Sequence, residues 1–144
     1  MSPILPFILF LGLGASVLAQ PAQGIVGTWE FVSAKTTRED GTTVEFTTHD
    51  LRSTKILNQT YFCVVTRNAD GSFRHTNLGP YDLEGDLYTE ALEYSTNPNW
   101  TGSKSVYKSK VEGDLWHIDT LGDALPRRGE VWRRVQGARE AVEF

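Results

Sequence analysis

The chain has 144 residues, of which 14 are Lys or Arg and 18 are Asp or Glu, and its formal net charge of −4 argues against a dedicated nucleic-acid surface. Cys63 is its only cysteine, so an internal disulfide is excluded and the fold must be stabilised by burial and backbone hydrogen bonds. The two basic clusters, KSVYKSK and RRGEVWRR, alternate with apolar residues and are interpreted as solvated strand faces.

The N-terminal segment has the pattern of a secretory signal peptide. Ile4 to Leu18 is an apolar run without a charge, and Val17-Leu18-Ala19 is a small-residue pattern that signal peptidase accepts. The run is shorter than the roughly 20 residues that a relaxed membrane span requires. We therefore expect a signal peptide over residues 1–19 and a secreted or periplasmic product with no stable membrane span after cleavage. A retained membrane anchor is the alternative.

Beyond residue 23 the chain predicts short strands separated by turns. The expected strands are rich in Val, Thr, Tyr, Phe and Trp, and cover residues 26–35, 53–57, 60–67, 73–83, 87–94, 104–111, 115–121 and 130–135. Residues 41–52 are ambiguous and are interpreted as an extended segment with one helical turn. The turns LEGDLY and VEGDLW place Gly85 and Gly113 where tight hairpins require a positive φ.

Consecutive short strands joined by tight hairpins predict an all-β fold, a single antiparallel up-and-down β-barrel of about eight strands. Closing such a meander removes its exposed edges. The expected domain covers residues 24–136 and is followed by a short C-terminal tail, residues 137–144. A two-sheet sandwich is the alternative.

The alternation of side chains along these strands suggests a cavity inside the barrel. One face of several strands carries aromatic residues with a few carboxylates, an Arg and a His, as small-molecule cavities do. The alternative is that these residues decorate the outer face of the sheet. Glu90, Glu130 and His75 are the candidates for binding a polar head group. The candidate ligand-binding residues are Phe31, His75, Tyr81, Tyr88, Glu90, Tyr94, Trp116, Glu130 and Trp132.

The segments GTWEFVSA, TKILNQTYFCVV, GPYDLEGDLYTEALEY, KVEGDLWHID and EVWRRV resemble, in order and spacing, a lipocalin-like (calycin-type) family of small exported proteins of unknown function. The resemblance covers about residues 24–136. It implies a calyx-shaped barrel that binds a small apolar or amphipathic molecule, and it transfers no catalytic residue. It also implies structural roles for Gly27, Trp29 and Arg134, in which the tryptophan closes one barrel end and the arginine stacks across it.

Motifs for nucleophilic catalysis, phosphate loops, dinucleotides and paired-cysteine metal sites are missing from the sequence. His49, His75 and His117 have no metal-ligand spacing, so no metal or cofactor is expected. Asn58 and Asn99 match the acceptor pattern for N-glycosylation and fall in predicted turns.

The leading functional hypothesis is a non-enzymatic exported barrel that binds one small, largely apolar molecule, for which an eight-stranded barrel has room. The second is a cavity enzyme, an isomerase, cyclase or hydrolase, in which Tyr81, Tyr88, Glu90 and Glu130 converge as an acid–base group. The third is a solid barrel whose surface binds a protein partner.

Overall fold

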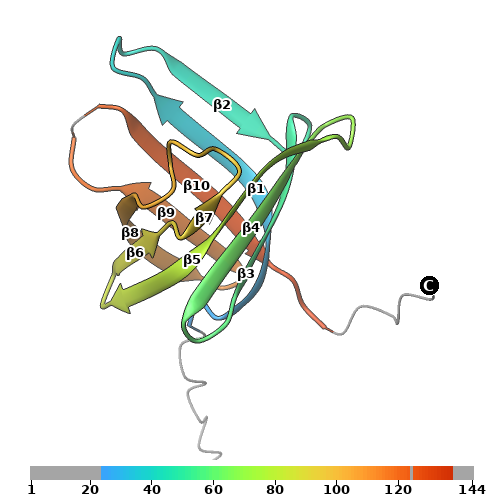
Figure 1. Cartoon of the computed structure of the whole chain (residues 1–144), viewed down its shortest axis with the longest axis vertical. Helices are drawn as coiled ribbons and strands as arrows, with labels where there is room; N and C mark the ends of the chain where they lie inside the picture. The colour runs from blue at the N-terminus through green and yellow to red at the C-terminus, as the bar shows by residue number, and fades with distance from the viewer. Residues whose placement is uncertain (1–23, 124, 138–144) are drawn as a thin grey trace, which may run out of the picture.

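The computed structural model describes residues 24–123 and 125–137, and the predicted signal peptide and residues 138–144 of the predicted tail lie outside them. The described residues form strands and turns and contain no helix long and apolar enough to cross a membrane. The strands in chain order (Figure 1) are β1 Gly27–Thr37, β2 Thr43–Thr47, β3 Leu51–Leu57, β4 Tyr61–Asn68, β5 Phe73–Glu84, β6 Leu87–Ala91, β7 Tyr94–Ser95, β8 Lys104–Glu112, β9 Leu115–Thr120 and β10 Arg127–Arg134.

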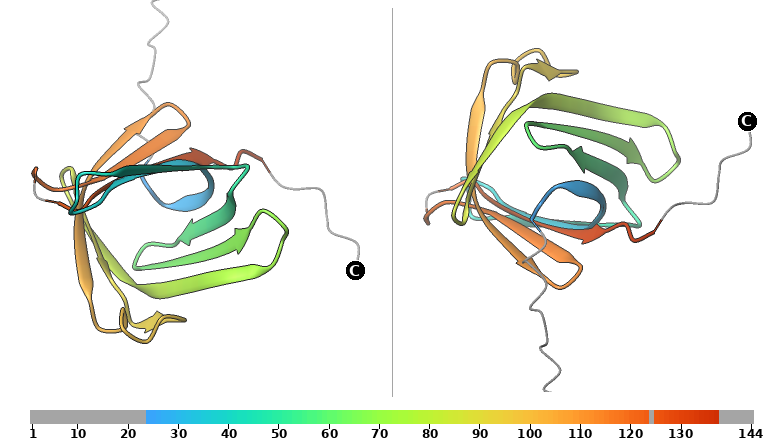
Figure 2. Two further views of the ribbon diagram at one scale, coloured as in Figure 1. Left: turned by 90° about the horizontal axis from the view of Figure 1, so that it is seen from above. Right: turned by 90° about the horizontal axis from the view of Figure 1, so that it is seen from below.

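Eight of these strands form a closed antiparallel barrel in the order β1-β3-β4-β5-β6-β8-β9-β10. The ring closes where β10 pairs with β1, in a register that places Arg134 opposite Trp29 and Trp132 opposite Phe31. Seen along the barrel, β3 to β5 form one wall and β1, β9 and β10 the opposite wall (Figure 2). The predicted barrel is confirmed, and the sandwich alternative is wrong because a hydrogen-bonded ladder joins the last strand to the first.

The segment 41–52, which we expected to be extended with one helical turn, is extended as the strand β2 and contains no helical turn. β2 pairs with the second half of β1, Ser33–Thr37, while β3 pairs with the first half, Gly27–Glu30. The expectation of a helical turn was wrong because the long β1 leaves a free edge beyond β3, and β2 satisfies the hydrogen bonds of that edge. β2 thereby extends one rim of the barrel (Figure 1).

The two repeated turns have the backbone conformation that their glycines predict. Gly85 has φ 62° between β5 and β6, and Gly113 has φ 58° between β8 and β9. These positive angles strain residues that carry a Cβ, so glycine is required at both turns.

The predicted strand 87–94 is broken after Ala91, and the break reverses the direction of Tyr94. β6 pairs with β5 up to Glu90 opposite Tyr81, and β7 pairs with β5 at Tyr94 opposite Leu78. The register of β7 on β5 is therefore shifted by one residue relative to that of β6. Such an offset sends later side chains to the opposite face. A Cβ on Gly79 of β5 would collide with the carbonyl oxygen of Ala91, so glycine permits the close approach at this break.

One half of the barrel is filled by aromatic side chains. Trp29, Trp116, Tyr88 and Phe62 are fully buried, and the ring of Trp116 lies 5.2 Å from Trp29 and 5.1 Å from Tyr88. The guanidinium carbon of Arg134 lies 4.1 Å from the centre of the Trp29 ring, which is the stack that the resemblance implies.

Arg134 also connects the end of β10 to the segment before β1. Its guanidinium donates hydrogen bonds to the carbonyl oxygens of Val26, at 2.9 Å, and Gly24, at 2.6 Å. The Trp29 indole donates to the carbonyl oxygen of Ile25 at 2.8 Å. These contacts cover the packed end of the barrel.

The close approach at Gly79 predicts that Gly79→Ala lowers the free energy of unfolding by about 3 kcal/mol, because the backbone of β6 must move to admit a methyl group. Urea unfolding followed by tryptophan fluorescence measures the change. Gly24→Ala is the control, since no atom lies within 4 Å of a Cβ added there. Equal stability of both variants would contradict this account of the strand break.

Candidate functional site in the barrel cavity

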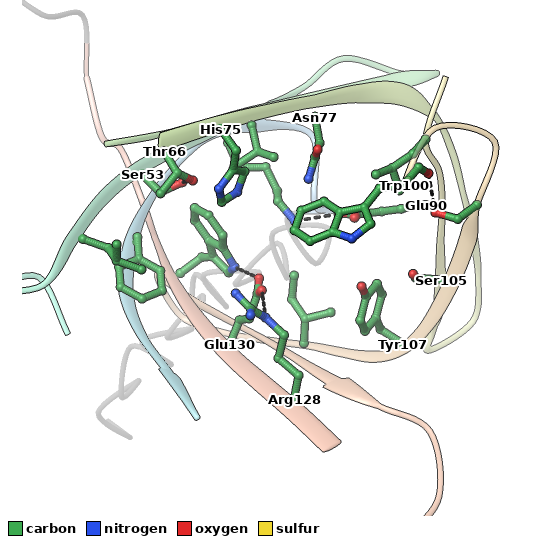
Figure 3. Close-up of a pocket in the computed structure, with 18 residues that line it drawn as sticks. Ser53, Thr66, His75, Asn77, Glu90, Trp100, Ser105, Tyr107, Arg128 and Glu130 are labelled. Carbon is green, nitrogen blue, oxygen red and sulfur yellow. Dashed lines mark hydrogen bonds and ion pairs between the residues drawn. The ribbon is translucent and has the colours of Figure 1, made fainter. Parts of the chain in front are cut away.

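The unfilled half of the barrel contains a cavity of about 310 Å³. All eight strands of the barrel ring and the segments on either side of β7 contribute its walls, and their side chains surround the space from all sides (Figure 3). The lining residues are Phe31, Leu51, Ser53, Lys55, Val64, Thr66, His75, Asn77, Glu90, Leu92, Trp100, Ser103, Ser105, Tyr107, Ile118, Arg128, Glu130 and Trp132.

The cavity floor contains a buried ion pair. The Lys55 ammonium donates a hydrogen bond to Oε1 of Glu90 at 2.7 Å, and the two side chains are 4% and 10% exposed. The Tyr88 hydroxyl, which lies among the packed aromatic residues, donates to the same oxygen at 2.8 Å. The floor therefore joins the packed half of the barrel to the hollow half.

Aromatic rings also lie close to the Lys55 ammonium on its side toward the packed half of the barrel. Its nitrogen lies 5.0 Å from the ring centre of Trp132, 5.3 Å from Trp116 and 5.7 Å from Tyr88. A cation over such rings is attracted by their electron-rich faces. Because burial of an ammonium is costly, this arrangement and the carboxylate together stabilise a charge that is only 4% exposed.

A second charged cluster lies at the side of the cavity. Glu130 accepts hydrogen bonds from Nε of Arg128 at 2.6 Å and from the Trp132 indole at 2.8 Å, one on each carboxylate oxygen. Burial alone would raise the pKa of Glu130, but the positive charges of Lys55 and Arg128 and these two hydrogen bonds outweigh it and lower that pKa. Glu130 is therefore ionised at neutral pH.

The remaining titratable groups of the wall are neutral at pH 7. Burial, with the nearby charges of Arg74 and Arg128, lowers the pKa of His75, so its imidazole is uncharged. Burial and the Glu90 carboxylate raise the pKa of Tyr107 to about 12. The wall therefore presents two positive charges, two negative charges and several neutral hydrogen-bonding groups.

Trp100 lies at the mouth of the cavity. Its indole comes from the loop after β7, is 45% exposed, and packs edge-to-face on His75 with ring centres 6.0 Å apart. In Figure 3 it extends over the middle of the opening. A bound molecule would therefore meet an aromatic surface at the mouth as well as on the walls.

The structure brings five of the predicted ligand-binding residues to the cavity wall: Phe31, His75, Glu90, Glu130 and Trp132. Tyr88 and Trp116 point inward but belong to the packed half, beneath the floor. Their placement in the wall was wrong because the barrel is hollow over only part of its length.

Tyr81 and Tyr94 are also absent from the wall. Tyr81 packs on Tyr88, with ring centres 5.6 Å apart, and its hydroxyl donates to the carbonyl oxygen of Asn58. Tyr94 is 63% exposed because the break after β6 turns it to the outer face. Its inward placement from strand alternation was therefore wrong.

The proposed acid–base group forms only in part. Tyr88 and Glu90 share a hydrogen bond, but burial and Glu90 raise the pKa of Tyr88, so it keeps its proton, and it lies outside the cavity wall. Glu90 is also neutralised by Lys55. Tyr88 and Glu90 are therefore arranged to stabilise the floor, and the Tyr81 hydroxyl does not hydrogen-bond to either of them.

Lys55, Arg128, Tyr107 and Trp100 line the cavity but are not among the predicted ligand-binding residues. Tyr107 and Arg128 belong to the two basic clusters that we interpreted as solvated strand faces, and for these two residues that interpretation was wrong. A signal exists for three of the four residues. In LRSTKIL, Lys55 lies on the same strand face as two buried leucines. Arg128 shares a strand face with Glu130, and Tyr107 shares one with the small residues Ser105 and Ser109. Trp100 lies in a loop, where alternation carries no information.

Comparisons with solved structures show the lipocalin-like fold. A lipocalin-like protein from Bacteroides uniformis ATCC 8492 aligns with a TM-score of 0.50 and 17% identity over 76% of this chain and 97% of its own. An uncharacterized protein from Bacteroides eggerthii DSM 20697 aligns with a TM-score of 0.50 and 15% identity over 76% and 98%. A designed fluorescence-activating β-barrel aligns with a TM-score of 0.42 and 16% identity over 76% and 93%.

Searches of family models and of curated proteins give no match. At the identities of the structural matches, the likeness establishes the fold alone.

Removing one member of the buried ion pair leaves the other charge without a partner. We expect Lys55→Met to lower the free energy of unfolding by about 3–5 kcal/mol, as measured by urea unfolding. The control is Lys108→Met, which removes an exposed pair with Asp86 at 3.7 Å and should cost less than about 1 kcal/mol. If both variants lost a similar small amount of unfolding free energy, the burial of the Lys55 charge would be contradicted.

The lowered pKa of Glu130 predicts how its contribution to stability depends on pH. Because the folded-state value lies below the reference value of 4.5, the stabilisation is complete above that value and is lost as the pH falls below it. The difference in free energy of unfolding between wild type and Glu130→Gln should therefore be largest near neutral pH and shrink as the pH falls below 4.5. A difference that is independent of pH would rule out this contribution.

Proposed function

We propose that this chain binds one small molecule, with a largely apolar body and a polar head, inside the barrel. The observation that carries the proposal is the cavity of about 310 Å³, which lies at the lower end of the range of roughly 300–1,000 Å³ for small-molecule sites. It combines the aromatic rings of Phe31, Trp100, Tyr107 and Trp132 with convergent polar and charged groups, the two elements that such sites use.

The charged groups of the wall support the same proposal. Buried ion pairs contribute little to stability compared with well-packed apolar residues, so a barrel that served only as a solid scaffold would gain nothing from Lys55 and Glu90 in its interior. Polar groups at the end of an apolar cavity can instead orient a ligand. The lipocalin-like fold, which encloses room for one small molecule, is compatible with this function.

Export of the mature protein is part of the proposal. It is supported by the uncharged apolar run of residues 4–18 and the small-residue pattern that ends at Ala19, both of which lie outside the described residues.

The binding of a small molecule can be tested directly. Native mass spectrometry of the mature protein, purified without detergent, would reveal any stoichiometric molecule that it carries.

Filling the cavity should abolish binding. Ser105 lines the cavity and pairs in register with Glu90, so Ser105→Trp places an indole directly above the floor. We expect this variant to weaken binding of the neutral fluorescent probe N-phenyl-1-naphthylamine by about tenfold or more, about 1.4 kcal/mol. Fluorescence titration measures the dissociation constant.

The matched control is Val106→Trp, one residue along β8, where the side chain is exposed on the outside of the barrel. This variant should bind the probe as the wild type does. If the wild type takes up no probe, or if the two variants bind it equally well, the cavity is not the binding site.

A further inference from the structure

The charges that face the cavity cancel. Lys55 and Arg128 are positive, Glu90 and Glu130 are negative, and the His75 imidazole is neutral. Each positive group lies on a carboxylate, at 2.7 Å for Lys55 and Glu90 and at 2.6 Å for Arg128 and Glu130. An ionic ligand would therefore enter a wall that offers it no uncompensated counter-charge.

A charged head group would either remain unpaired or break one of these pairs. An unpaired charge on the ligand would lose its hydration without gaining a partner. If the ligand instead separated a buried ion pair, one protein charge would be left buried without a partner. A neutral head group avoids both costs. The charge balance of the wall therefore selects against anions and cations alike.

The floor nevertheless offers strong hydrogen bonds of both kinds side by side. The hydrogen bonds from Lys55 and Tyr88 both fall on Oε1 of Glu90, so among the described residues Oε2 is the oxygen left to accept from a ligand. The Lys55 ammonium has three donors, of which Glu90 takes one. A ligand group that reaches the floor thus meets a donor next to an acceptor.

The charged cluster at the side of the cavity is a weaker candidate for the head group. Both oxygens of Glu130 already accept a hydrogen bond, from Arg128 and from Trp132. The aromatic residues Phe31, Trp132, Tyr107 and Trp100 also line the cavity, and Figure 3 shows Tyr107 and Trp100 on either side of its open space. Ring faces and edges of this kind pack well against a flat aromatic body.

Resting on the proposed function, we infer that the ligand is a neutral, flat molecule whose head carries a donor and an acceptor on one edge, as a carboxamide, lactam or imide does. Its carbonyl oxygen accepts from Lys55 and its N–H donates to Glu90. This pairing satisfies both floor residues while their own ion pair stays intact.

Four ligands of nearly the same shape test this inference by isothermal titration calorimetry. 2-Naphthamide is neutral and has both donor and acceptor, 2-acetonaphthone has only the acceptor, 2-naphthoate is an anion and 2-naphthamidine is a cation. We expect the amide to bind at least about tenfold more tightly than each of the other three. It alone makes hydrogen bonds to both charged floor residues without carrying a charge, and hydrogen bonds to charged groups are stronger than those between neutral groups.

Variants assign the preference to the floor. Lys55→Met, Tyr88→Phe and Glu90→Leu together replace the buried pair and its hydrogen-bond donor by apolar groups of similar size, a change that folds tolerate better than loss of one charge. The triple variant should bind the amide and the ketone equally. The control is Lys108→Met with Asp86→Leu, which removes an exposed pair and should keep the preference for the amide.

The outcomes separate the inference from the proposed function. Binding of the ketone, the anion or the cation as tight as that of the amide overturns the neutral donor–acceptor head while leaving a binding cavity. Failure of all four ligands and of N-phenyl-1-naphthylamine overturns the cavity function itself. If circular dichroism shows that the triple variant does not fold, the order of the four affinities in the wild-type protein decides.

Discussion

The pairing of β1 with β10 is the constraint on which the rest of the structure depends. It turns a meander of hairpins into a closed ring and brings Arg134, near the end of the described chain, onto Trp29 near its beginning. Because the ring is closed, each of its eight strands pairs with a neighbour on both sides, and their inward side chains enclose one interior. The aromatic end that this contact covers leaves the opposite end of the barrel free for a cavity.

The Lys55–Glu90 pair marks the boundary between the packed half and the hollow half. Toward the packed end, Glu90 accepts from Tyr88, and the Lys55 ammonium is surrounded by aromatic rings. Toward the cavity, the same two side chains form the floor. One ion pair thus completes the hydrogen bonding of the aromatic core and supplies the polar groups of the site, which links the energetics of the fold to the proposed recognition of a neutral head group.

The repeated glycine turns and the alternation of strand residues were enough to predict the closed antiparallel barrel. They were also enough to place Glu90, Glu130 and Trp132 inside it, because alternation is a local property of an extended chain. The errors arose where a non-local contact overrides alternation. Tyr94 faces outward since the approach of Gly79 to Ala91 shifts the register by one residue, and the segment 41–52 forms a strand because β1 leaves part of its edge unpaired.

The sequence by itself determined the class of fold, the positions of its tight turns and which side chains share a strand face, since each depends on neighbours a few residues apart. Only the tertiary structure decided how far the aromatic core fills the barrel, and hence that Tyr88 and Trp116 lie below the cavity rather than in its wall. It also decided that Lys55 meets Glu90, 35 residues away. Depth along the barrel and pairing of charges depend on the stagger of strands around a closed ring, which no local pattern encodes.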